Sequence, residues 1–161
     1  MEQTLTDDEM ANHEEMLKIA VSTALGELLK HDSYLLEKDV NERSISHHLA
    51  RYIQLQFPGW HVDCEYNRNH DDVKRLQLEG RDTTDLDVEA VTVFPDIIIH
   101  QRATDENLLA IEIKKTTSRV ESDYDIKKLR AFKSELHYRF AAFIQLEAGT
   151  EKATVKKLDF I

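Results

Sequence analysis

The sequence predicts an α/β fold in which helices flank a mixed central β-sheet. Short apolar runs rich in β-branched residues, such as Ile97-Ile-Ile99, have the composition of buried strands. Longer segments before and after these runs repeat their apolar residues at helical spacing. The order along the chain is helix, strands, helix and strand, which is typical of an α/β domain.

The individual elements follow from periodicity and from turn-forming residues. Helical spacing predicts helices over residues 13–30, 40–57 and 121–138, and Pro58-Gly59 ends the second of them. Apolar or alternating runs predict strands over residues 61–67, 73–78, 91–100, 107–115, 140–146 and 153–160.

Length and composition indicate one globular domain. The chain has 161 residues, of which 41% are hydrophobic and 32% are charged, and no linker rich in Gly, Ser or Pro divides it. We therefore expect a single domain over residues 1–161, with a helical extension over 1–35 and a core over 40–147. One cysteine, an acidic start and the lack of an apolar run of about 20 residues favour a cytoplasmic protein.

The formal net charge of −10 is unevenly distributed along the chain. Residues 1–39 hold 10 acidic and 3 basic side chains, and residues 71–89 hold 7 acidic and 3 basic ones. Residues 112–139 are locally basic, with 8 basic and 5 acidic side chains. Because nucleic-acid affinity depends on neutralising phosphates, this charge disfavours tight non-specific binding but leaves a nucleic-acid substrate open.

Charged residues inside apolar strands are the strongest functional signal. Asp96 opens one predicted strand directly after Pro95, and Glu112 and Lys114 lie on one face of the next. A buried carboxylate is costly unless it is paired or binds a metal, so Asp96 and Glu112 predict a Mg²⁺ site that would also accept Mn²⁺. Lys114 would then orient or activate a water, or stabilise charge on a phosphate. Alternatively, it forms a structural salt bridge with one of the two acids.

Glu42 offers a third carboxylate, and two interpretations of it stay open. It lies within the apolar arc of its predicted helix, which would direct it toward the sheet and the other acids. The segment Asp39-Val-Asn-Glu42 also matches a capping box, in which Glu42 would bind a first-turn amide instead.

These residues resemble a known superfamily. The motifs that carry the likeness are Phe94-Pro-Asp96, Ile97-Ile-Ile99 and Ala110-Ile-Glu112-Ile-Lys114. Together they resemble the PD-(D/E)xK nucleases, and with the segment at 62–68 they look like small bacterial and phage-borne members of that superfamily. The resemblance covers about residues 40–147 and implies a restriction-endonuclease-like core of order α-β-β-β-α-β, with the N-terminal helix as an addition.

The resemblance also implies roles for single residues. Asp96 and Glu112 would be the Mg²⁺ ligands, Lys114 the catalytic lysine, and Glu42 the acid often found on the first core helix. In this superfamily the helix after the E-x-K strand often presents a basic residue to the site, and Lys128 is the candidate here.

Two substrate-binding candidates keep alternatives. The alternative for Lys128 is a solvated helix face, on which it pairs with Asp125 three residues before it. His100 shares strand parity with Asp96, so it either lines the cleft or simply ends its strand.

The expected function is that of a Mg²⁺-dependent endonuclease that hydrolyses phosphodiester bonds, in DNA rather than RNA. The alternative is a catalytically silent nuclease-fold module that binds a protein or a nucleic acid. In either case the acidic N-terminal helix could dock a partner protein or a second copy of the chain.

Overall fold

The structure is a computed structural model that describes residues 5–66, 68–69, 72–73, 75–76, 91–92 and 94–161. Its centre is a five-stranded sheet of strand order β1-β6-β7-β8-β9. The strands are β1 (His61–Cys64), β6 (Ile97–His100), β7 (Asn107–Lys115), β8 (Phe140–Leu146) and β9 (Val155–Phe160). β7 and β8 run parallel and the other neighbours run antiparallel, so the predicted mixed α/β sheet is confirmed.

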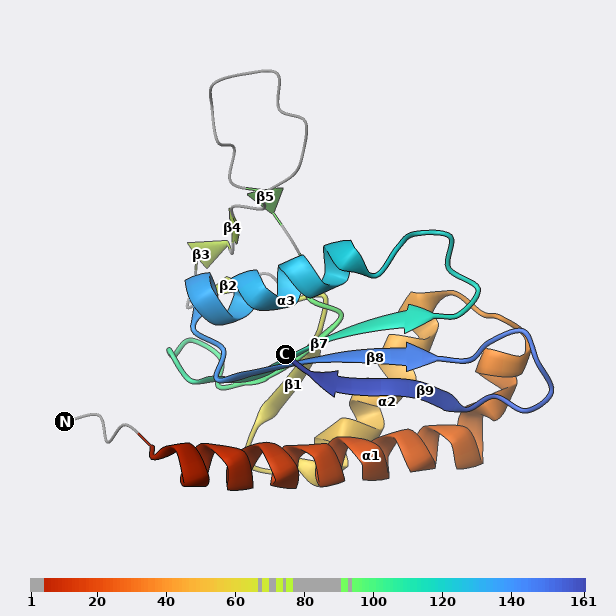
Figure 1. Cartoon of the computed structure of the whole chain (residues 1–161), viewed down its shortest axis with the longest axis horizontal. Coiled ribbons are helices and arrows are strands. Elements are labelled where there is room, and N and C mark those ends of the chain that lie inside the picture. Colours follow the sequence, from red (N-terminus) through yellow and green to blue (C-terminus); the bar gives the residue numbers. More distant parts are fainter. Residues whose placement is uncertain (1–4, 67, 70–71, 74, 77–90, 93) are drawn as a thin grey trace, which may run out of the picture.

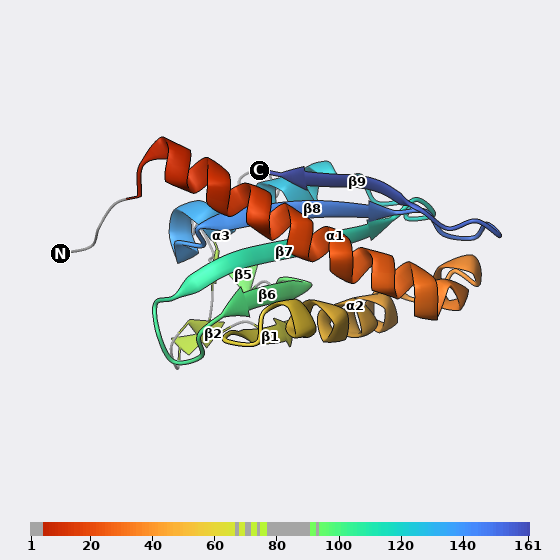
Figure 2. The same ribbon diagram turned by 90° about the horizontal axis from the view of Figure 1, so that it is seen from below.

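Three helices in the described ranges cover the two faces of this sheet. They are α1 (Asp7–Glu37), α2 (Glu42–Gln56) and α3 (Asp123–Leu136). α1 and α2 lie on one face and α3 lies on the other (Figures 1 and 2). None of them has an apolar stretch long enough to cross a bilayer.

The predicted strands differ from the structure mainly between β1 and β6. β1 ends at Cys64 because Glu65 has a φ of 50°, which breaks the extended backbone. The strand predicted over 91–100 is divided into β5 (Val91–Thr92) and β6. β5 pairs with β4 (Arg75–Leu76), and β2 (Arg68–Asn69) pairs with β3 (Asp72–Val73), both outside the central sheet. The rest of the strand predicted over 73–78 lies outside the described residues.

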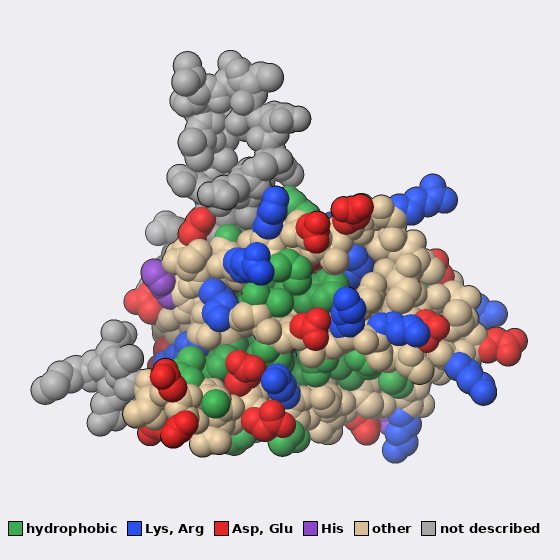
Figure 3. Space-filling view, viewed as in Figure 1, with side chains coloured by type: hydrophobic (Ala, Val, Ile, Leu, Met, Phe, Trp, Pro, Cys, Tyr) green, Lys and Arg blue, Asp and Glu red, His purple; other side chains and the backbone are tan. Residues whose placement is uncertain are grey.

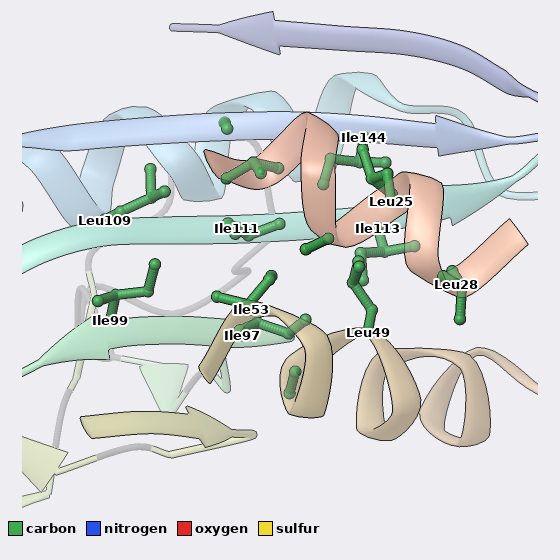
Figure 4. Close-up of a cluster of buried hydrophobic side chains, with 14 of the residues drawn as sticks. Leu25, Leu28, Leu49, Ile53, Ile97, Ile99, Leu109, Ile111, Ile113 and Ile144 are labelled. Atoms are coloured by element: carbon green, nitrogen blue, oxygen red, sulfur yellow. The ribbon is translucent and has the colours of Figure 1, made fainter. Parts of the chain in front are cut away.

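The main hydrophobic core lies between the sheet and the helix pair α1–α2. Leucine and isoleucine side chains from α1, α2, β6, β7 and β8 converge there (Figure 4). A second, smaller cluster between α3 and the other face contains Leu129, Phe132 and Phe143. Both faces of the central strands are therefore shielded from water, as expected for a sheet covered on both sides.

α1 is longer than predicted and forms part of the main core. Thr6 caps it, in a capping box with Glu9 that fixes its start. Its only non-helical residue is Asp32 (φ −129°, ψ 24°), where the helix kinks before its last turn. The face that includes Val21 and Leu28, both 0% exposed, packs on the sheet and on α2. The N-terminal extension expected from sequence thus packs as a layer of the domain.

We expect Leu28→Ala to lower the free energy of unfolding by about 2–5 kcal/mol, because it leaves a cavity under α1. Ile19→Ala on the same helix is the matched control; Ile19 is 61% exposed, and its loss should cost less than about 0.5 kcal/mol. Urea denaturation of both variants measures the difference. Equal stability of Leu28→Ala and the unaltered protein would contradict the packing of α1 on the sheet.

Candidate functional site

The site begins where β7 extends beyond its neighbour β6. β6 pairs with β7 only as far as Ile111, whereas β7 continues to Lys115. Two carboxylates take the place of the missing strand: Asp96 Oδ2 accepts from the Ile113 amide at 2.7 Å, and Glu42 Oε2 accepts from the Lys115 amide at 3.1 Å. These hydrogen bonds bring both acids to the same edge of β7.

The orientation of Glu42 distinguishes between its two interpretations. Asn41 caps α2, and its side chain accepts from the Ser44 amide at 2.9 Å, so α2 has a cap without Glu42. Glu42 reaches the sheet instead, as the helical arc predicts. Burial raises the pKa of Glu42, the hydrogen bond from the Lys115 amide lowers it, and the charge of Asp96 raises it further, with a net upward shift.

Glu112 is the buried centre of the site. Alternation along β7 points it toward α3, where it is only 2% exposed and shares a side-chain hydrogen bond with Asp96. Burial and then the charge of Asp96 raise the pKa of Glu112 well above its usual value of 4.5. Burial also raises the pKa of Asp96, although the hydrogen bond from the Ile113 amide opposes this. Two carboxylates therefore meet where neither is well solvated.

Lys128 supplies the positive charge of the site. Its ammonium lies 2.9 Å from Glu112 Oε1 and 3.3 Å from the carbonyl oxygen of Phe94. The side chain is 12% exposed, so the solvated-face alternative is wrong for this residue. Burial lowers the pKa of Lys128, but the charge of Glu112, its hydrogen bond and the charges of Asp96 and Asp125 together outweigh burial, and the net shift is upward. Lys128 is therefore protonated at neutral pH.

Lys114 lies on the same face as Glu112, as the spacing predicts, but its ammonium pairs elsewhere. It binds Asp125 of α3 at 2.5 Å and the carbonyl oxygens of Val120 and Glu121 at 3.2 and 3.4 Å. These contacts of Lys114 hold the start of α3 against β7. The salt bridge expected with Glu112 or Asp96 is replaced by one with an acid of the helix.

A pocket of about 280 Å³ opens beside these acids. It is lined by Glu42, Arg43, Ser46, Cys64, Glu65 and Asp96. Arg43 was not predicted from the sequence; it lies at the exposed rim and pairs with Glu65 at 2.9 Å. Only its position next to Glu42, in the first turn of α2, could have suggested from the sequence that Arg43 lies at the pocket.

His100 lies apart from this group. It is four residues along β6 from Asp96, which is about 13 Å for an extended chain. Its Nε2 lies 2.7 Å from Asp63 Oδ2, and Arg102 pairs with the same carboxylate. His100 is 2% exposed and belongs to an ion-pair group with Asp63 and the half-exposed Arg102 at the far end of the strand.

Asp96 and Glu112 are the candidate ligands of a metal ion. Within the described residues, no group of three or more His, Cys, Asp or Glu side chains has an arrangement that could hold a metal ion. Asp96 and Glu112 supply two hard oxygen donors whose charges repel each other. Mg²⁺ is commonly held by one or two carboxylates together with water, so this donor set fits Mg²⁺ or Mn²⁺.

We expect Lys114→Met to cost about 3–5 kcal/mol of unfolding free energy, because it leaves the buried Asp125 carboxylate without its cation. The double variant Lys114→Met/Asp125→Leu should recover most of that loss, since both charges are removed together. Urea denaturation of the single and double variants completes the cycle. Additive effects of the two substitutions would show that the pair does not interact.

The ion pairs of Asp63 make the stability of the fold depend on pH. Burial raises the pKa of Asp63, but the hydrogen bonds and charges of Arg102 and His100 together outweigh burial, and the net pKa lies below 3.8. An acid with a lowered pKa in the folded state stabilises the fold above pH 3.8 and loses that effect as pH falls through the lower value. The stability difference between the unaltered protein and Asp63→Asn should therefore shrink as unfolding is measured at progressively lower pH below 3.8. A difference that stays constant there would contradict the ion pair.

Comparisons of the chain with models of protein families, with curated proteins and with solved structures found no match. The chemistry of the site therefore has to be inferred from its own residues. The site consists of two carboxylates in contact, a largely buried lysine paired with Glu112, and an adjoining pocket that a third carboxylate and an arginine line.

Proposed function

We propose that the protein is a metal-dependent nuclease that hydrolyses phosphodiester bonds in DNA. The observation that carries this proposal is the contact between Asp96 and Glu112 beside the protonated Lys128. Two carboxylates and a lysine at one point form a site suited to a divalent cation and a phosphate. Asp96 also borders the pocket, through which a substrate can approach.

The order of elements supports a restriction-endonuclease-like core. When β2 to β5 outside the central sheet are set aside, the order is α2, β1, β6, β7, α3 and β8, which matches the α-β-β-β-α-β order that the sequence resemblance implies. Asp96 stands at the head of β6, and Glu112 and Lys114 lie on the adjacent β7. α1 and β9 are additions at either side of this core.

Each residue of the site would have a separate role in hydrolysis. Asp96 and Glu112 would hold the Mg²⁺ ion, which, when bound, supplies Lewis-acid stabilisation of negative charge on a phosphate. Lys128 would stabilise the same charge, because its ammonium already lies against Glu112. Lys114 acts through structure: its bond to Asp125 sets the position of α3 and hence of Lys128. Arg43, exposed at the rim of the pocket, would contact the substrate backbone.

A catalytically silent binding module is the second candidate. Lys128 pairs with Glu112 at 2.9 Å, and a purely structural ion pair would have the same geometry. The net charge of −10 likewise argues against a large duplex-binding surface. Catalytic turnover separates the two candidates.

The decisive experiment measures cleavage of double-stranded DNA, single-stranded DNA and RNA with Mg²⁺ or Mn²⁺. We expect cleavage of DNA, a loss of about 10²–10³-fold in Lys128→Met, and little change in Lys127→Met, its exposed neighbour on α3. Glu112→Gln should abolish cleavage while it retains the size of the side chain. Circular dichroism should show that all three variants are folded.

Metal binding is measured separately by calorimetry with Mn²⁺. Binding should disappear in Asp96→Asn and persist in Lys127→Met. Metal binding without cleavage of any substrate would favour the silent module, and no metal binding by the unaltered protein would refute the nuclease.

A further inference from the structure

The last strand of the sheet has an unpaired edge. β9 pairs with β8 on one side, and among the described residues no strand pairs with its other side. Figure 1 looks onto this edge, with β9 in front of the sheet between α3 and α1. Such an edge presents a row of unpaired backbone groups to which another strand can bind.

The register with β8 shows which backbone groups face outward. The Ile161 amide donates to the Ala141 carbonyl oxygen at 2.9 Å. Because hydrogen-bonded and non-hydrogen-bonded residues alternate in an antiparallel pair, Asp159 and Lys157 also bond to β8. The amide and carbonyl groups of Leu158 and Phe160 therefore face the open edge.

The charges on β9 complement one another across a two-fold axis. Lys157 and Asp159 are exposed and lie on the same face of the strand, two residues apart. Neither has an ion-pair partner within the described part of the chain, whereas the neighbouring Lys156 pairs with Glu147 at 3.6 Å. When two copies of β9 run antiparallel, Lys157 of one copy can therefore lie opposite Asp159 of the other.

We propose that β9 is a dimerisation strand that pairs antiparallel with β9 of a second copy, with the two-fold axis at Leu158. The two Leu158 residues then exchange their outward amide and carbonyl bonds. Lys157 of each copy lies opposite Asp159 of the other, which gives two ion pairs. The sheets of the two copies join into one continuous sheet of ten strands.

Charge selects this register over its neighbours. Shifting the axis to residue 157 places two lysines opposite each other, and shifting it to residue 159 places two aspartates opposite each other. Like charges at directly opposed positions destabilise a strand pair. Of the registers that use the outward groups of β9, the one centred on Leu158 therefore combines hydrogen bonding with charge pairing.

The surroundings of the strand favour a second copy over an unrelated strand. On this side of the molecule, hydrophobic side chains form a strip between α3 and α1, with lysines and acidic residues beside it (Figure 3). Lysines on an edge strand normally repel incoming strands. A strand that carries an aspartate opposite Lys157 and a lysine opposite Asp159 avoids this repulsion, and β9 itself meets both conditions. This surface is centred on β9 and adjoins α1. The proposal is independent of nuclease activity.

Sedimentation equilibrium of the full chain, from about 1 µM to 1 mM, tests the proposal. We expect a monomer–dimer equilibrium whose dissociation constant rises about tenfold or more in Lys157→Glu, because two attractive pairs become repulsive. The swapped variant Lys157→Asp/Asp159→Lys should restore dimerisation to within about threefold. Lys152→Glu, the same charge change in the loop before β9, should have little effect.

Site-specific crosslinking tests the register. In a Cys64→Ser background, Leu158→Cys should form a disulfide-linked dimer on mild oxidation, because opposed Cα atoms at the axis would be about 5.5 Å apart. Lys152→Cys is the control and should not crosslink. A protein that stays monomeric throughout the concentration range would overturn the proposal. So would a dimer that Lys157→Glu leaves unchanged, or a Leu158→Cys variant that crosslinks no better than its control.

Discussion

Burial of the Glu112 carboxylate costs free energy that a neighbouring cation must offset, and this requirement determines how α3 packs on the sheet. α3 meets it with Lys128, and the reverse pair of Lys114 with Asp125 joins the same two elements a turn earlier in the helix. Because each pair takes one charge from β7 and one from α3, sliding the helix along the strand would separate both. The opposite face of β7 carries isoleucines, whose hydrophobic contacts are non-directional and do not fix the register in this way.

The sequence predicts the centre of the sheet better than its margins. β7 and β8 coincide with the predicted ranges because their apolar runs are long and end at polar residues. β6 starts later than predicted, since the backbone turns at Pro95-Asp96 after a stretch that belongs to another pairing. α1 is longer than its apolar pattern because a capping box begins it and many of its polar residues face water. Local patterns indicate burial well, whereas caps and turns decide where elements end.

For the candidate site, the sequence predicts which face a side chain occupies but not its partner. Strand alternation places Glu112 and Lys114 on one face, and helical periodicity turns Glu42 toward the sheet. The pairing of Lys128 with Glu112 depends on the rotation and height of α3 above the sheet, which no short motif encodes. His100 shows the same limit, because its partner Asp63 comes from a strand 37 residues away in the sequence.

Because β7 extends beyond β6, the site can be followed by hydrogen exchange at two backbone amides of β7. The Ile113 and Lys115 amides are held by carboxylates instead of by a strand, so each is protected from solvent by a single side chain. Hydrogen exchange at the Ile113 amide therefore reports on the Asp96 carboxylate, and exchange at the Lys115 amide reports on Glu42. Any ligand that draws one carboxylate away from the strand would speed exchange at one amide and leave the rest of β7 protected. Engagement of the two acids can thus be followed separately, without a substrate.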